Sequence, residues 1–154
     1  MSVTTSSLSV AQVDVRGPRF SAWITTAVLV VVLALSTTFP TAATILLALQ
    51  TVAFAIGAAA GPRRSPYGTL FAKLISPRLG PVTEREPVPP LRFAQLVGFV
   101  FAAVGVIGFV SGLTVVGLVA TAFALFAAFL NAAFAVCLGC MVYPLVTRFR
   151  STPA

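Results

Sequence analysis

Four long apolar runs alternate with polar segments along the chain, and none of them contains Asp, Glu, Lys or Arg. They cover residues 20–39, 41–60, 93–110 and 113–136, and the last run stays apolar as far as Val146. An α-helix of about 20 apolar residues is long enough to cross a bilayer core of about 30 Å. The pattern therefore predicts an all-α integral membrane protein, a bundle of four transmembrane helices.

Two short breaks divide the four predicted helices into two hairpins. Pro40 lies between the first two runs, and Ser111 and Gly112 lie between the last two. Proline interrupts a helix because it lacks an N–H and its ring clashes with the preceding turn. We expect two helical hairpins joined by the one long connection, residues 61–92.

That connection is basic and rich in proline, with six of the ten Lys and Arg residues of the chain. Residues 66–75 are expected to form a short interfacial helix, because five apolar or aromatic side chains recur there at helical spacing. These are Tyr67, Leu70, Phe71, Leu74 and Ile75. Residues 76–90 hold five prolines, so we expect that part to be extended and irregular.

The charged residues predict the orientation. The net charge is +7, and the basic residues fall within residues 16–19, 63–92 and 148–150. With four spans these three segments share one side of the membrane, and cytoplasmic loops carry an excess of Lys and Arg. We expect one domain over residues 14–150, multi-pass in the cell membrane with cytoplasmic termini, behind a flexible uncharged tail over residues 1–13.

The basic residues allow two other interpretations. Nucleic-acid binding needs basic and aromatic residues on one wet face, whereas these lie between apolar runs, so no nucleic-acid partner is expected. A signal peptide with Arg16 and Arg19 as its basic flank could end near Ser36. The length of the first run and the span that follows at once favour a retained helix instead.

Composition excludes several enzyme classes. The chain is 58% hydrophobic and 8% charged, against about 25% charged in soluble domains. It has no His, and its acids, Asp14, Glu84 and Glu86, all lie outside the apolar runs. Ser-His-Asp hydrolysis and His-type zinc sites therefore lack their residues, and the spans lack the ionisable groups of proton-coupled transporters. No cofactor is expected, and the lipid bilayer is the first partner.

Small and polar residues inside the runs predict close helix packing. Small residues recur four apart at Gly57 and Gly61, at Gly108 and Gly112, and at Ala124, Ala128 and Ala132. Such spacing serves packing within one bundle, and a homodimer is the alternative. The polar residues of the spans are Thr25, Thr26, Gln50, Gln95, Thr121 and Asn131. We expect them to form hydrogen bonds between helices rather than a binding site.

Cys137 and Cys140 are the only cysteines, and they form a C-x-x-C near the end of the last run. On an intact helix their Cβ atoms would be about 5–6 Å apart, whereas a disulfide needs about 3.5–4.5 Å. Pro144 deprives the Cys140 carbonyl of its helical partner, and Gly139 adds backbone freedom. We therefore expect the long last helix to bend between Gly139 and Pro144, with the pair at the cytoplasmic boundary.

The pair makes Cys137 and Cys140 the candidate catalytic residues. They would exchange electrons or sulfur with a thioredoxin-like or sulfur-carrier partner through a mixed disulfide. Against this, free Cys is common in apolar interiors, and a position near a helix C-terminus disfavours the thiolate. The alternative function is a non-enzymatic membrane subunit or assembly factor, which docks partners or anionic lipid through the basic connection.

Four segments, in order, resemble a bacterial membrane-protein family known as domain of unknown function 4395. They begin at Val13-Asp14-Val15-Arg16, Arg63-Arg64-Ser65-Pro66, Arg92-Phe93-Ala94-Gln95 and Phe129-Leu130-Asn131-Ala132, the last continuing through Cys140. The resemblance covers nearly the whole chain after residue 13. It implies a small integral membrane protein and supplies no catalytic residues. Relatives often have an acid where this chain has Met141, which weakens any role for a carboxylate next to the thiols in sequence.

Overall fold

Four long helices make up most of the computed structural model, which describes residues 11–150. They are α1 (Arg16–Leu35), α2 (Pro40–Ala60), α4 (Val88–Val110) and α5 (Thr114–Phe134). Each is long and apolar enough to cross a membrane, and large side chains such as Ile107, Val115 and Phe123 are exposed on the outside. The prediction of an all-α protein with four membrane-capable helices is confirmed, and this apolar exterior suits a lipid bilayer.

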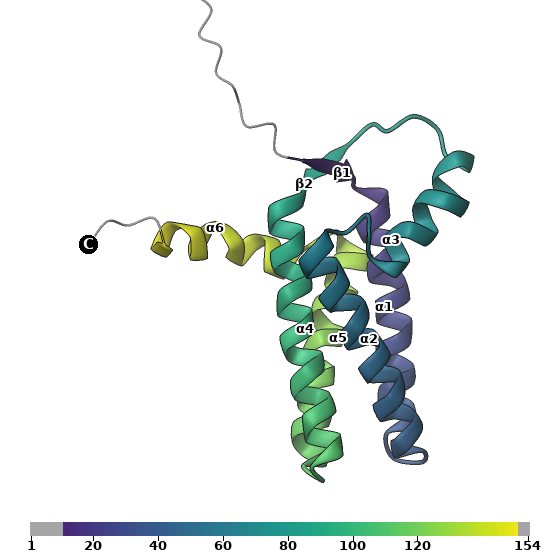
Figure 1. The fold of residues 1–154 in the computed structure, drawn as a ribbon, viewed down its shortest axis with the longest axis vertical. Coiled ribbons are helices and arrows are strands. Elements are labelled where there is room, and N and C mark those ends of the chain that lie inside the picture. Colours follow the sequence, from purple (N-terminus) through teal and green to yellow (C-terminus); the bar gives the residue numbers. More distant parts are fainter. Residues whose placement is uncertain (1–10, 151–154) are drawn as a thin grey trace, which may run out of the picture.

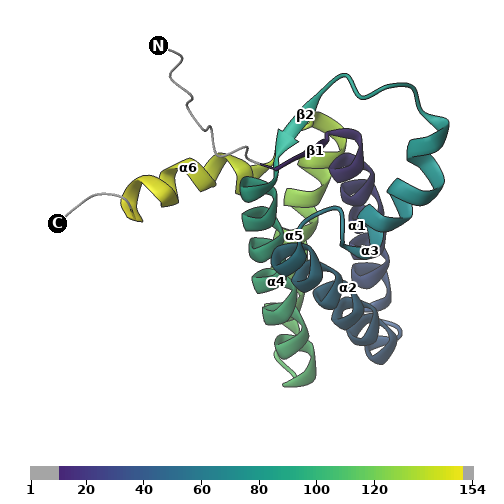
Figure 2. The ribbon, with the colours of Figure 1, turned by 45° about the horizontal axis from the view of Figure 1, so that its top comes forward.

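The four helices run side by side as one bundle (Figure 1). α1 contacts α2 and α5, and α4 contacts the same two helices. The short connections 36–39 and 111–113 lie at one end of the bundle. The remaining elements gather at the opposite end (Figure 2). The fully buried side chains of Leu29, Val32 and Leu47 form the centre of the core.

The small residues are used for contacts inside this one chain. A Cβ at Gly108 would lie 2.6 Å from the backbone nitrogen of Gly117, so α4 and α5 touch backbone to backbone there. Gly57 likewise faces the side chain of Gln95. Gly61 and Gly112 have positive φ and end their helices. In each glycine pair the first residue therefore serves packing inside the bundle, and the second ends a helix.

Two short antiparallel strands pair the segment just before α1 with the segment just before α4. β1 (Gln12–Asp14) pairs with β2 (Arg85–Pro87), with Val13 opposite Glu86. The Arg16 guanidinium lies 2.7 Å from the Asp14 carboxylate, and its hydrogen bonds hold the pKa of Asp14 below the usual value. Val13 is buried.

These strands correct two predictions. The predicted tail over residues 1–13 is too long, because Gln12 and Val13 belong to β1; residues 1–10 lie outside the described part. The segment 76–90 is not wholly irregular, because a 3-10 turn, η2 (Ser76–Arg78), and strand β2 lie within it. Strands of three residues carry too little alternation to be recognised from sequence.

A short helical segment packs beside α1. It consists of α3 (Pro66–Leu70) and η1 (Phe71–Ile75). The Ser65 hydroxyl caps α3 by accepting a hydrogen bond from the Gly68 N–H at 3.1 Å. Phe71 is buried with its ring 5.7 Å from that of Phe20, whereas Leu74 is exposed. The expected apolar face is therefore divided between the bundle and the outside.

The last apolar run is not one helix. α5 ends at Phe134, Ala135 is left-handed with φ 57°, and α6 (Leu138–Arg150) leaves sideways past α4, away from the bundle (Figure 2). The predicted helix to Val146 is therefore wrong, and so is the predicted position of its bend. The break precedes Cys137, and Pro144 lies inside α6. α5 already ends at the left-handed Ala135, so Pro144 does not determine where that helix stops.

Candidate functional site

Cys137 occupies the N-cap position of α6, the residue just before the helix begins. Its carbonyl accepts the first hydrogen bond of that helix, from the Met141 N–H at 3.0 Å. Its Sγ accepts a hydrogen bond from the Cys140 N–H at 3.2 Å. This is the contact a capping side chain makes with the third helical residue. The expectation of a pair near a helix C-terminus is therefore wrong.

This position changes the electrostatics of the pair. A helix N-terminus carries a partial positive charge from its unpaired N–H groups. A sulfur at that position is stabilised as the thiolate, the form that attacks disulfides. The sequence predicts the pair near a helix C-terminus, a position that disfavours the thiolate. In this fold Cys137 lies at a helix N-terminus, so that objection does not apply to it.

Cys137 and Cys140 are joined by a disulfide, with their Cα atoms 5.1 Å apart. Cys137 lies outside the helix, so the two sulfurs meet without distortion of a regular helical turn. Both residues are only partly buried. The fold therefore accommodates the oxidised pair at a position from which it can be approached.

The end of α5 is stabilised so that the chain can turn into the pair. The N–H groups of Ala135 and Val136 both point to the Leu130 carbonyl. The Arg19 guanidinium, from the start of α1, donates to the Ala132 carbonyl at 3.4 Å. These contacts satisfy carbonyls that lose their helical partners when α5 stops.

A close contact then holds α6 against α4. A Cβ added to Gly139 would lie 2.6 Å from the Ala94 Cα, so no larger residue fits there without movement. One turn further, the rings of Tyr143 and Phe93 are 5.8 Å apart. Gly139 therefore allows α6 to pack directly on the α4 backbone, and this contact sets the place of the disulfide.

A cavity of about 320 Å³ lies next to the pair, at the end of the bundle opposite the short connections 36–39 and 111–113. α1, α4 and α5 supply most of its wall, and the start of α6 closes it. Cys137, Leu138 and Gly139 belong to its lining. Four phenylalanines also line it: Phe54, Phe101, Phe123 and Phe126. One sulfur-bearing residue thus borders a largely apolar space between helices that are long and apolar enough to cross a membrane.

Two side-chain amides in this cavity have no protein partner. Gln95 and Asn131 line it, and neither makes a side-chain hydrogen bond within residues 11–150. Gln50 differs, because it donates to Thr25 at 3.4 Å and accepts from the Tyr67 hydroxyl. Gln50 therefore links helices as expected, whereas Gln95 and Asn131 border the cavity without such a bond, and the Gln95 amide lies beside Gly57 of α2.

On its other side the pair borders a shallow groove that contains a carboxyl group. Glu86 of β2 lines this groove together with Cys137, Cys140 and Met141. Partial burial raises the pKa of Glu86, and the neighbouring Glu84 raises it further, while Arg19 opposes them. A carboxyl group of raised pKa is better suited to exchange protons near neutral pH than an ordinary one.

The residues that sequence reasoning missed come from distant segments. Glu86 reaches the groove because β2 pairs with β1, and Ala135 acquires its role only through a left-handed conformation. Within the described residues no group of three His, Cys, Asp or Glu could hold a metal ion.

Comparison with known proteins gives one match. Residues 13–148 match the model of the family described as domain of unknown function DUF4395. No curated protein and no solved structure matches the chain.

Proposed function

Since the chain belongs to the family described as domain of unknown function DUF4395, which brings no activity with it, we propose from the site alone that it is a membrane dithiol that exchanges disulfides. The working groups are Cys137 and Cys140. The observation that carries the proposal is the N-cap position of Cys137, where its Sγ accepts the Cys140 N–H. That arrangement favours a thiolate at Cys137 and keeps its partner within bonding distance.

The exchange starts from the disulfide. A thiolate of the partner attacks Cys137 Sγ, a mixed disulfide forms, and Cys140 leaves as a thiolate that takes up a proton. The partner's second thiolate then attacks the partner sulfur that is bonded to Cys137, and Cys137 leaves as a thiolate. A sulfur that is stabilised as a thiolate is the better leaving group. In total the partner dithiol becomes a disulfide, and two electrons and two protons enter the Cys137–Cys140 pair.

Glu86 would supply and remove the proton of Cys140 in this scheme. It lines the groove with both cysteines, and its pKa is raised mainly by burial. A carboxyl group whose pKa is raised holds its proton more readily than an ordinary one, so it can protonate the departing thiolate and accept the proton again when the disulfide reforms. This carboxylate belongs to a residue of β2, and not to the residue that follows Cys140 in the sequence, which is Met141.

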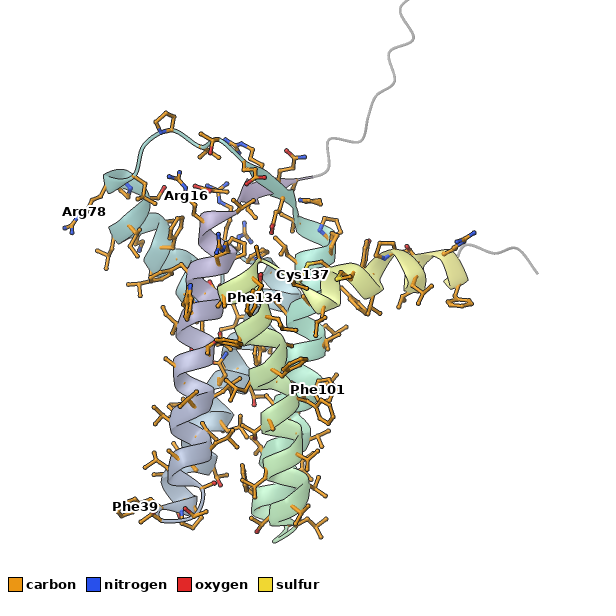
Figure 3. The ribbon with its side chains drawn as sticks, turned by 180° about the vertical axis from the view of Figure 1, so that it is seen from behind. Arg16, Phe39, Arg78, Phe101, Phe134 and Cys137 are labelled. Atoms are coloured by element: carbon orange, nitrogen blue, oxygen red, sulfur yellow. A yellow bond between two sulfur atoms is a disulfide. The ribbon has the colours of Figure 1, made fainter. Side chains whose placement is uncertain are left out.

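The distribution of charge supports the expected placement in the membrane. Arg16 and Arg78 lie at one end of the molecule, Phe39 lies at the other, and Cys137 is near the charged end (Figure 3). The connections 36–39 and 111–113 at the uncharged end carry no Lys or Arg. By the excess of basic residues in cytoplasmic loops, the charged end is cytoplasmic and the helices form two hairpins that enter from that side.

α6 has the properties of a helix that lies along the membrane surface. Val142, Leu145 and Phe149 are exposed and share one face by their spacing, whereas Cys140 and Thr147 lie on the opposite face. The helix projects sideways past α4, away from the bundle, instead of continuing α5 (Figure 1). Its apolar face would contact lipid, which leaves the Cys140 side toward the cytoplasm. The segment 66–75 would take a similar position beside α1.

A cytoplasmic site suggests the kind of partner. Cytoplasmic thiols are kept reduced, so the pair would receive electrons, or a sulfur atom, from a thioredoxin-like or sulfur-carrier protein. It would not donate disulfides to secreted proteins. A cysteine introduced at Thr83, in the connection before β2, should react with an impermeant reagent only from the cytoplasmic side. Reaction from outside alone would contradict this topology.

Trapping the mixed disulfide tests the proposal. A Cys140→Ser chain lacks the thiol that displaces a partner from Cys137 by re-forming the intramolecular disulfide, so under mild oxidation it should retain a partner on a non-reducing gel, released by dithiothreitol. The matched Cys137→Ser chain should retain much less. Mass spectrometry of the trapped sulfur distinguishes a protein disulfide from a persulfide. Failure of both single variants to retain a thiol protein under mild oxidation would refute the proposal.

The basic connection supports a second candidate, a non-enzymatic subunit that docks an acidic partner or anionic lipid. Arg63, Arg64 and Arg78 are exposed, and the ion pair found within residues 11–150 is that of Asp14 with Arg16. Complementation separates the two candidates. A chain with both cysteines changed to Ser that fully restores the phenotype of a deletion strain would favour the docking function over the dithiol.

A further inference from the structure

The disulfide lies between two spaces of different character. The groove on the β2 side holds Glu86 and both cysteines, and it is open to a protein partner. The cavity on the other side is apolar, is lined by Cys137 and lies inside the bundle. We propose that this cavity binds the head group of a lipid-soluble quinone, which accepts the two electrons of the reduced pair. This inference rests on the proposed dithiol function and names its second substrate.

The size of the cavity fits a ring system. An engineered cavity of about 150 Å³ binds benzene, and this one measures about 320 Å³. It therefore has room for one substituted ring or a fused pair of rings. The side chains of Phe54 and Phe101 offer flat apolar walls, against which aromatic rings and quinone rings stack.

The cavity also has an exit toward the lipid. Phe123 and Phe126 line it on α5, yet each is 57% exposed on the outer surface of the bundle. Because these two residues line the cavity and also face outward, an apolar chain could leave the cavity beside α5. A quinone with an isoprenoid tail has this shape, since its ring would enter while its tail remains in the bilayer.

The unpaired amides supply the specificity. A quinone has two carbonyl oxygens that only accept hydrogen bonds, and the amides of Gln95 and Asn131 each have N–H groups with no protein acceptor. A hydrocarbon chain alone would leave these groups unsatisfied, which carries a desolvation cost. Gln95 lies on α4 next to Ala94, the residue that contacts Gly139, and its amide lies beside Gly57 of α2, at the edge of the cavity.

The reaction balances with no further reagent. Cys137 and Cys140, both as thiols, lose two electrons and two protons as the S–S bond forms. The quinone oxygens gain those two electrons and two protons and become the hydroxyls of the quinol. A soluble dithiol then reduces the disulfide again through the groove. The protein would thereby pass electrons from a cytoplasmic thiol to a membrane carrier.

The experiment uses the full chain in lipid nanodiscs, reduced and kept free of oxygen. The probe is a short-tailed benzoquinone with every ring position substituted, so that a thiol cannot add to a ring carbon. Quinone absorbance and free thiols are followed together. One quinol should form for each two thiols lost, at a rate that saturates with quinone concentration. The chain with both cysteines changed to Ser should give no reaction.

Variants show whether the reaction occurs in this cavity. Ala127→Phe fills the space that Ala127 lines, and should abolish saturation. Ala122→Phe, on the exposed side of the same helix, is its matched control and should react as the natural chain does. Gln95→Leu and Asn131→Leu should each raise the quinone concentration at half-saturation about tenfold, the effect of one lost hydrogen bond of about 1.4 kcal/mol.

The outcomes separate this inference from the proposed function. If the natural chain exchanges disulfides with a reduced thioredoxin but reacts with the quinone without saturation, or equally in both phenylalanine variants, the quinone site is refuted and the dithiol function stands. If neither thioredoxin nor quinone changes the redox state of the pair, both fail. If phospholipid alone occupies the cavity and no quinol forms, the cavity is a lipid site and the inference is overturned.

Discussion

Gly139 lies directly on the backbone of Ala94, so close that an added Cβ would be 2.6 Å from the Ala94 Cα. Gly139→Ala should therefore push α6 away from α4 and lower stability by about 1–3 kcal/mol, the usual cost of overpacking. Gly80→Ala is the matched control, because no atom lies within 4 Å of its added Cβ. Thermal unfolding in detergent compares the two, and equal melting temperatures would contradict the contact.

The left-handed Ala135 predicts a stabilising substitution. An L-residue with a Cβ loses about 1–2 kcal/mol in this conformation, and glycine does not. Ala135→Gly should therefore raise the stability of the chain by about 1 kcal/mol. Ala133→Gly, two residues earlier and inside α5, should do the opposite, because glycine in a helix interior costs about 1 kcal/mol. Shifts of the same sign in both variants would rule out a left-handed turn at Ala135.

Glu86 predicts a dependence of stability on pH. Burial raises its pKa in the folded chain, so the folded state binds the proton more tightly than the unfolded state. Stability then falls as pH rises from the ordinary glutamate pKa through the raised one. Glu86→Gln removes this loss, so it should raise the melting temperature near neutral pH and have no stabilising effect at about pH 4. A gain that is the same at both pH values would contradict the raised pKa.

The spans could be read from the sequence because they depend on composition and length alone. Runs without charge fix where helices can cross a bilayer, and Pro40 and Gly112 mark their ends. The pairing of β1 with β2 could not be predicted from the sequence, because strands of three residues show too little alternation of polar and apolar side chains. Glu86 therefore gave no indication that it would lie beside the cysteines.

The position of the helix break shows why the site was harder to predict. Pro144 is the residue that local chemistry marks as a breaker, and it nevertheless lies inside α6. Ala135 is a good helix former, but the chain turns there. The turn depends on tertiary contacts, namely Gly139 on Ala94 and Arg19 on the Ala132 carbonyl. Because of those contacts Cys137 and Cys140 lie at the start of α6, whereas the sequence predicts them near the end of a long helix.

The acidity of the Cys137 thiol tests the central claim most directly. Alkylation rates of the Cys140→Ser and Cys137→Ser chains, measured against pH in detergent, give the thiol pKa of Cys137 and of Cys140. The N-cap position predicts a Cys137 pKa below the value of about 8.5 for a free cysteine, and below that of Cys140. It also predicts faster reaction of Cys137 at neutral pH. A Cys137 pKa at or above that of a free cysteine would contradict a reactive dithiol at the start of α6.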